Sequence, residues 1–149
     1  MREDLPILIA EDDEDDVTLL HAAIRRAGMN NPIRFVPNGY EAVEYLMGHG
    51  DYADRRKYPF PRIIITDLKM PRLTGLELLD WLHRHPKCAV IPTVLLSGSA
   101  VRDDIENAFH LGVNSYFQKP TTLDELTALM HLLHEYWSKS EVPLITRNC

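Results

Sequence analysis

Residues 63–71 read Ile-Ile-Ile-Thr-Asp-Leu-Lys-Met-Pro, so an uninterrupted apolar run ends in a carboxylate at Asp67. A short run that is apolar on both faces is typical of a strand in a parallel sheet covered by helices on each side. The segment 63–66 therefore predicts a buried strand, with Asp67 just past its carboxyl end.

The chain on either side of this strand repeats one alternation of short apolar runs with helical patterns. Further strands are expected at 7–10, 33–36, 93–97 and 115–118. Helices are expected at 14–27, 40–47, 75–85, 101–111 and from 122 onward. Five strand and helix units favour an α/β, doubly wound parallel sheet with helices on both faces. The 149 residues are about the length of a single domain.

Composition excludes several classes of function. The formal net charge is −6, which argues against general binding to nucleic acid or anionic lipid, since both need a basic face. No apolar run is long enough to cross a membrane, and the first residues lack a secretory signal. The two cysteines, Cys88 and Cys149, have no metal-binding spacing. We therefore expect a cytoplasmic protein with both thiols reduced.

Polar side chains follow four of the predicted strands. Glu11 and Asp12 follow the first strand, Asp67 the third, Ser97 ends the fourth, and Lys119 follows the fifth. Neighbouring parallel strands lie ~4.8 Å apart and present their carboxyl ends at one edge of the sheet. The sequence therefore predicts that these side chains meet in one shallow pocket.

Several carboxylates in one pocket are unfavourable unless a cation offsets their charge. Mg²⁺ suits a site built from one or two carboxylates, waters and a phosphate. We expect Asp12 and Asp67 as direct Mg²⁺ ligands, the backbone carbonyl of Lys69 as a third, and Glu11 acting through a bound water.

With a metal ion in place, the Asp67 carboxylate can attack a phosphoryl group and form an aspartyl phosphate. Lys119 then offers a point charge for the phosphoryl oxygens, and Ser97 offers a hydroxyl donor. A simpler reading applies to the acidic run at 13–16, because acidic residues that open a helix commonly cap it and complement its dipole.

These residues resemble the response-regulator receiver family of two-component signalling over residues 5 to about 137. The motifs that carry the resemblance are Glu11-Asp12, Asp67-Leu68-Lys69-Met70-Pro71, Ser97-Gly98 and Tyr116-Phe117-Gln118-Lys119-Pro120. The resemblance implies a flavodoxin-like sheet of order 2-1-3-4-5. It also implies that Tyr116 is the switch aromatic and that the Lys119–Pro120 peptide is cis.

The function implied by the resemblance is that of a single-domain response regulator. A sensor histidine kinase would pass a phosphoryl group to Asp67, and the chain would signal through the face made by helix 101–111, strand 115–118 and the last helix. The protein would be no enzyme in the ordinary sense, but a phosphoacceptor that catalyses its own phosphorylation and dephosphorylation. The receiver core would span about 5–137, followed by a C-terminal extension at about 138–149.

The long loop 48–61 and the tail after Tyr136 and Trp137 are similar to those of small regulators that partner bacterial phytochrome kinases. A phytochrome is therefore the expected kinase. Position 69 departs from the family pattern, because Lys69 stands where a small or amide residue is usual. Its side chain lies either beside the phosphoryl group or in solvent.

Other functions fit the residues less well. The alternative kept is a pseudo-receiver that binds partners without phosphorylation. A haloacid-dehalogenase-type phosphatase needs a second acid two residues after its nucleophile, and that position is Lys69. A flavodoxin needs a phosphate-binding loop of Ser, Thr and Gly after the first strand, where this chain is acidic.

The last helix and the tail predict a homodimer. Leu132 and Tyr136 lie off the stripe that faces the core and form an i, i+4 pair. Beyond the helix, Val142, Leu144 and Ile145 are apolar, so we expect an extended arm that packs on a second copy. The alternative is that the tail folds back on its own domain.

Overall fold

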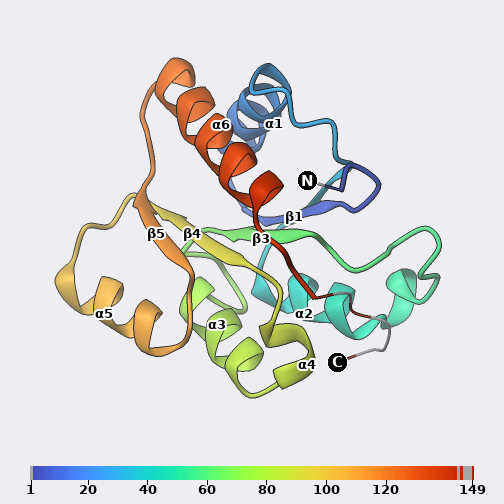
Figure 1. Cartoon of the computed structure of the whole chain (residues 1–149). Helices are drawn as coiled ribbons and strands as arrows, with labels where there is room; N and C mark the ends of the chain where they lie inside the picture. Colours follow the sequence, from blue (N-terminus) through green and yellow to red (C-terminus); the bar gives the residue numbers. More distant parts are fainter. Residues whose placement is uncertain (1, 144, 146–148) are drawn as a thin grey trace.

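The computed structural model describes residues 2–143, 145 and 149. Its sheet has five parallel strands in the order β2-β1-β3-β4-β5 (Figure 1). The strands are β1 (Ile7–Ala10), β2 (Ile33–Val36), β3 (Ile63–Thr66), β4 (Thr93–Ser97) and β5 (Ser115–Gln118). This order confirms the flavodoxin-like, doubly wound α/β fold.

Helices cover both faces of the sheet. They are α1 (Glu14–Arg26), α2 (Gly39–Met47), the 3-10 helix η1 (Gly50–Tyr52), α3 (Gly75–His83), α4 (Pro86–Ala89), α5 (Arg102–His110) and α6 (Leu123–Lys139). In Figure 1, α1 and α6 lie side by side on one face, and α2, α3, α4 and α5 lie on the other. Among the described residues, no helix combines the length and apolar character needed to cross a bilayer.

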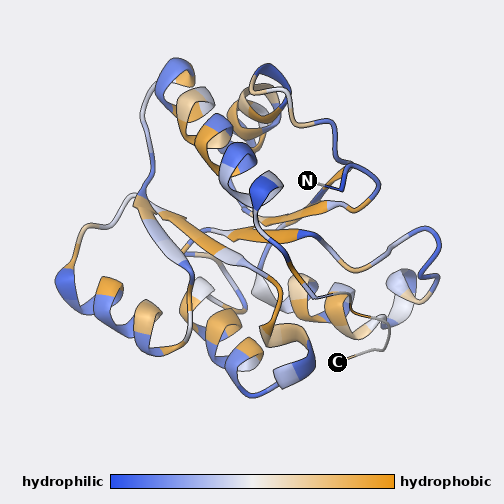
Figure 2. Ribbon diagram, viewed as in Figure 1, coloured by the Kyte–Doolittle hydropathy of each residue, from blue (hydrophilic) through white to orange (hydrophobic). Residues whose placement is uncertain are grey.

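The core alternates along each strand, as expected when both faces of a sheet are buried. Ile7, Ile9, Ile63 and Ile65 pack toward α1 and α6. The residues between them pack toward the opposite helices; they include Leu8, Ala10 and Ile64. Figure 2 shows the central strands as almost continuously apolar, with the hydrophilic residues on the outer sides of the helices. The apolar core therefore fixes the strands, and with them the positions of the residues that follow them.

The start of α3 is locked to the backbone at the end of β3. Gly75 N donates to the Leu68 carbonyl at 2.8 Å. A Cβ at Gly75 would lie 2.1 Å from the Asp67 carbonyl oxygen, so no other residue fits without moving the backbone. Thr74, the N-cap residue of α3, and Glu77 in its first turn form a reciprocal capping box. This junction fixes the backbone that carries Asp67.

Two local predictions are wrong. The helix expected at 75–85 ends at His83, and Pro86 opens the short helix α4, because proline is favoured at the first position of a helix. The Lys119–Pro120 peptide, implied to be cis, is trans. Trans is the lower-energy form of an X–Pro peptide by roughly 0.5–1 kcal/mol.

The tail folds back on its own domain, which corrects the extended arm expected from the sequence. Val142 packs against the core beneath α1 and α6, whereas Ile145 and Cys149 pack on the side of α2 and α3. Leu144, the third apolar residue of the expected arm, lies outside the described residues. The apolar tail residues thus find buried surface within the same chain.

The two cysteines are paired, which corrects the prediction of two reduced thiols. Cys88 in α4 is fully buried, and a disulfide joins it to Cys149 with the Cα atoms 5.6 Å apart. That separation is ordinary for a disulfide. The cysteines are 61 residues apart in the sequence, so only the return of the tail brings them together.

Candidate functional site

The backbone ladder of the sheet continues into the residues expected to form the site. Glu11 N donates to the Val36 carbonyl at 3.0 Å, and Asp67 N donates to the Ala10 carbonyl at 3.0 Å. Lys119 N donates to the Ser97 carbonyl at 2.7 Å. The side chains that follow β1, β3 and β5 are therefore held at one edge of the sheet, as predicted.

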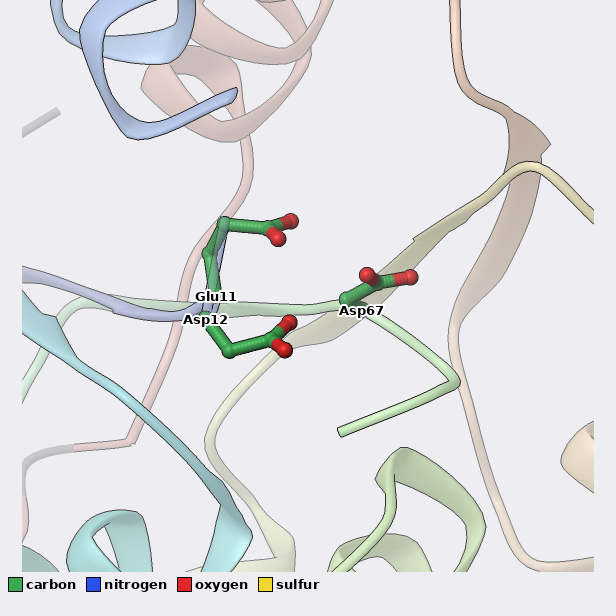
Figure 3. A group of neighbouring side chains, drawn as sticks. All are labelled: Glu11, Asp12 and Asp67. Carbon is green, nitrogen blue, oxygen red and sulfur yellow. The ribbon is translucent and has the colours of Figure 1, made fainter. Parts of the chain in front are cut away.

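Three carboxylates meet at this edge (Figure 3). Glu11, Asp12 and Asp67 each offer one oxygen, and these oxygens all lie within 4.8 Å of one another. Glu11 is buried, Asp67 is half-buried and Asp12 is exposed. Glu11 Oε1 accepts from the Asp13 amide at 3.1 Å, and Asp67 Oδ1 accepts from the Leu68 amide at 2.7 Å. Backbone amides in the loops therefore hold the Glu11 and Asp67 carboxylates in this cluster.

Burial raises the pKa of two of these carboxyls. For Glu11, desolvation outweighs the opposing hydrogen bonds from Lys119 and the Asp13 amide. For Asp67, desolvation outweighs the charge of Lys119, and the nearby Asp12 carboxylate adds to the increase. Lys119 and the backbone amides thus offset only part of the cost of holding the Glu11 and Asp67 carboxylates charged at this site. Because hard divalent cations prefer several carboxylate oxygens, the three residues fit such an ion.

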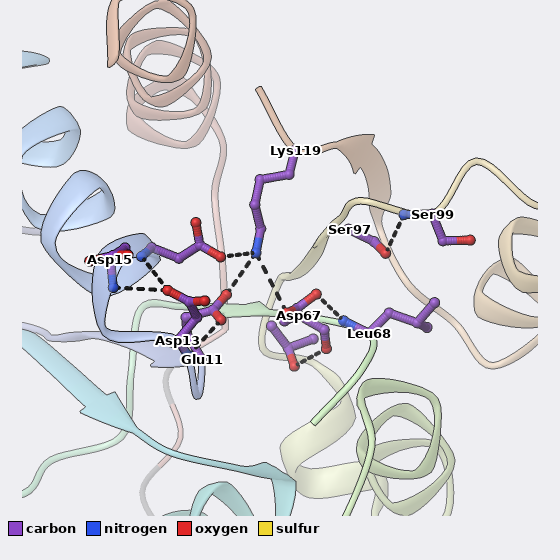
Figure 4. Close-up of polar contacts among 10 residues, drawn as sticks. Glu11, Asp13, Asp15, Asp67, Leu68, Ser97, Ser99 and Lys119 are labelled. Carbon is purple, nitrogen blue, oxygen red and sulfur yellow. Dashed lines mark hydrogen bonds and ion pairs between the residues drawn. The ribbon is translucent and has the colours of Figure 1, made fainter. Parts of the chain in front are cut away.

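The side chain of Lys119 reaches into the same cluster (Figure 4). Its Nζ lies 2.9 Å from Glu11 Oε2, 2.9 Å from Asp16 Oδ2 and 3.5 Å from Asp67 Oδ2. Burial alone lowers the pKa of this ammonium, but the hydrogen bonds to Glu11 and Asp16 and the charge of Asp67 raise it above its ordinary value. Lys119 is therefore a permanent positive charge beside Asp67.

Asp16 is the site residue that the sequence analysis did not identify. The acidic run at 13–16 is typical of a helix cap, and Asp13 does have that role, because its Oδ1 accepts from the Asp15 and Asp16 amides at 2.9 and 3.1 Å. The Asp16 carboxylate instead binds Lys119. Its only signal in the sequence was its place in the first turn of the helix that follows Glu11 and Asp12.

Ser97, at the carboxyl end of β4, and Tyr116, in β5, are joined through one residue, Ser99. Ser97 is 2% exposed, and its Oγ accepts from the Ser99 amide at 3.0 Å. Tyr116 donates its hydroxyl hydrogen to the Ser99 carbonyl at 2.8 Å. Figure 4 shows Ser97 turned toward Ser99, away from Asp67. The Lys69 side chain is exposed.

Comparison with known proteins agrees with this geometry. The response regulator receiver domain model matches residues 7–131. Over 131 residues the chain is 31% identical to the probable methanogenesis regulatory protein FilR2 of Methanothrix harundinacea, covering 88% of this chain and 82% of FilR2.

Two solved structures of similar proteins share the fold. The phosphorylated cyanobacterial phytochrome response regulator RcpA has a TM-score of 0.86 and 30% identity, covering 95% of this chain and 99% of RcpA. The Mn²⁺-bound form of the response regulator Rcp1 has a TM-score of 0.82 and 26% identity, covering 94% of this chain and 99% of the Rcp1 chain. Rcp1 is a Synechocystis protein. The family model, the similar sequences and the shared fold therefore agree that this chain belongs to the response regulator receiver domain family.

Proposed function

We infer that this chain is a single-domain response regulator that accepts a phosphoryl group from a sensor histidine kinase on Asp67. The observation that carries the proposal is the position of the Asp67 carboxylate, which clusters with Glu11 and Asp12 and has the Lys119 ammonium 3.5 Å away. A nucleophilic carboxylate beside both a metal-binding set and a fixed cation suits phosphoryl transfer. The receiver core would span about 5–137, with a C-terminal extension at about 138–149.

The metal ion that best suits this proposal is Mg²⁺. Asp12 and Asp67 would bind it directly, the Lys69 carbonyl would be a third ligand, and Glu11 would act through a water molecule. When bound, Mg²⁺ supplies positive charge that offsets the phosphoryl oxygens. The partly compensated carboxylates at Glu11 and Asp67 support this choice of ligands.

The chain's own residues then perform the transfer. An Asp67 carboxylate oxygen forms a bond to phosphorus as the bond from phosphorus to the kinase histidine nitrogen breaks, and the imidazole leaves. Lys119 offsets charge on the phosphoryl oxygens, and the Ser97 hydroxyl donates a hydrogen bond to one of them. Hydrolysis of the acyl phosphate by water restores Asp67. The protein is thus a phosphoacceptor that promotes its own phosphorylation and dephosphorylation.

The shared contact at Ser99 supports a route from phosphorylation to the output surface. When the Ser97 hydroxyl turns to the phosphoryl group, the Ser99 amide loses its acceptor. The carbonyl of the same residue accepts from the Tyr116 hydroxyl, so we expect a shift of the Ser99 backbone to loosen the Tyr116 bond as well. Tyr116 lies in β5, between α5 and α6. We expect this α5-β5-α6 face to change its packing and to bind the output partner.

A homodimer and a phytochrome kinase complete the proposal. Leu132 and Tyr136 on α6 are large hydrophobic side chains, yet they are 56% and 63% exposed. Their exposure favours α6 as part of a dimer interface. The similarity to RcpA, a phytochrome response regulator, favours a phytochrome as the sensor kinase. We expect the protein to act in the cytoplasm, together with two-component partners of this kind.

The test is chemical labelling with a small acyl-phosphate donor. With Mg²⁺ present, the wild-type chain should gain one acid-stable, base-labile phosphoryl group, and a chelator should prevent the reaction. Asp67→Asn should not be labelled, whereas Asp51→Asn, which removes an exposed carboxylate in η1, should be labelled normally. Equal labelling of Asp67→Asn and wild type would overturn the assignment and favour a pseudo-receiver.

A further inference from the structure

We propose that Asp16 is a positioning residue that draws the Lys119 ammonium toward α1 and so keeps the Asp67 carboxylate available to the metal ion. The inference rests on the proposed function, because it concerns how the same site is kept ready for metal binding. It assigns a role to a residue outside the expected ligands and phosphoryl-binding groups.

The Lys119 ammonium contacts three carboxylates, and its contact with Asp67 is longer than the other two. Lys119 Nζ lies 2.9 Å from Asp16 and 2.9 Å from Glu11, within the range of short charge-assisted hydrogen bonds. Its distance to Asp67 Oδ2 is longer, at 3.5 Å, and is an ion pair. An ammonium has three hydrogens to donate, so Asp16 and Glu11 take the two strong bonds and Asp67 takes the weak one.

Removing the Asp16 carboxylate would leave one strong bond of Lys119 without an acceptor. Glu11 already accepts the other strong bond at 2.9 Å, so the carboxylate that can take the freed one is Asp67, at 3.5 Å, and a small movement of the flexible lysine stem would close that gap. A cation hydrogen-bonded to Asp67 competes directly with a metal ion for the same oxygen atoms. Asp16 therefore lowers the competition between the internal cation and the metal.

The structure leaves the Asp16 side chain free for this role. Asp13 caps α1 by accepting from the Asp15 and Asp16 amides, so the Asp16 backbone is fixed while its carboxylate is not used in capping. The Asp16 side chain keeps 31% of its exposure, against 2% for Glu11. It is held mainly by Lys119, and its substitution should not disturb the core.

Asp15 provides a matched control. It stands in the same first turn of α1, carries the same charge and is exposed. A general loss of negative charge near the site would affect Asp15→Asn and Asp16→Asn alike. The positioning role applies to Asp16→Asn alone, and it should disappear when Lys119 is absent.

The experiment is a double-mutant cycle read by calorimetric Mg²⁺ titration. We expect Asp16→Asn to weaken Mg²⁺ binding by about threefold or more, since Asp16 and the metal-binding carboxylates share one ion-pair network through Lys119. In a Lys119→Met background, the same substitution should have no larger effect than Asp15→Asn has in wild type. Asp16→Glu, which keeps the carboxylate, should restore much of the affinity.

The outcomes separate this inference from the function on which it rests. Equal effects of Asp16→Asn in the presence and absence of Lys119 would mean that Asp16 acts only as a distant charge, and the positioning role would be wrong. Unchanged Mg²⁺ affinity in Asp16→Asn, with normal phosphorylation of wild type, would overturn the inference and leave the proposed function intact. A wild-type chain that neither binds Mg²⁺ nor is labelled would overturn both.

Discussion

Lys119 Nζ lies 3.5 Å from Asp67 Oδ2, although β4 separates the two strands that these residues follow. The lysine side chain spans the end of β4 and approaches Asp67 from beyond the intervening strand. Ser97 ends β4, and its carbonyl accepts from the Lys119 amide at 2.7 Å. One backbone contact therefore sets the reach of the cation that faces the proposed phosphoacceptor.

Metal-free Asp67→Asn should be more stable than the wild type at neutral pH. The pKa of Asp67 is raised in the folded protein, mainly by burial, so its ionisation costs stability at pH values above that pKa. Asparagine removes this cost and keeps an oxygen that can accept from the Leu68 amide. The measurement is urea unfolding in a chelator at neutral and at acidic pH.

The pKa of Asp67 is raised in the folded protein, and this direction fixes how the stability difference between Asp67→Asn and wild type changes with pH. The advantage of the asparagine should be largest at neutral pH and should shrink as acid protonates Asp67 in the wild type. Added Mg²⁺ should stabilise the wild type and leave the variant unchanged. A variant that is less stable than wild type at neutral pH without metal would contradict the assigned direction.

Gly75→Ala should destabilise the fold, because the new Cβ would lie 2.1 Å from the Asp67 carbonyl oxygen. Overpacking of this kind typically costs about 1–3 kcal/mol, and here it would also displace the backbone that carries Asp67. Gly98→Ala is the control, since its Cβ would meet nothing within 4 Å. Chemical denaturation compares the two; equal stabilities would show that the α3 junction is not tightly packed.

The proposed dimer should depend on the exposed face of α6 and not on the tail. Leu132→Asp should lower the dimer affinity, because it places a charge in the apolar contact. Truncation after Lys139 should instead lower monomer stability by about 1–3 kcal/mol, since Val142 and Ile145 pack on their own domain. Sedimentation and unfolding under reducing conditions measure the two effects. If truncation after Lys139 alone abolished the dimer, the tail would be shown to pack on the second copy, as the sequence suggested.

The cysteine pair should be detectable by counting thiols. Without reductant, the denatured chain should show no reactive thiol, and after reduction it should show two, from Cys88 and Cys149. Cys149→Ser should expose one thiol without reductant, from Cys88. Two reactive thiols in the unreduced wild type would instead support the two reduced thiols expected from the sequence.

The sequence predicted the sheet and the convergence of its strand ends for a physical reason. Strands that are apolar on both faces need cover on both sides, and parallel strands bring their carboxyl ends together. Glu11, Asp12 and Asp67 could therefore be placed in one cluster without coordinates, and their oxygens do lie within 4.8 Å of one another.

The remaining features depend on contacts that no local pattern encodes. The bond from Asp16 to Lys119 joins residues 103 positions apart, and the cysteine pair spans 61 positions. The direction of the tail was decided by surface available on its own domain, at Val142 and Ile145, which the sequence could not locate. Short-range rules describe strands and caps, but such long-range choices follow only from the packed fold.

The most direct test of the central claim is phosphoryl transfer from a histidine kinase. A purified bacterial phytochrome kinase labelled on its histidine is mixed with the chain and Mg²⁺, and the label is followed in both proteins. We expect the label to leave the kinase and appear on the wild-type chain, and to stay on the kinase when Asp67→Asn is supplied. Label that moves equally well to Asp67→Asn would contradict Asp67 as the phosphoacceptor.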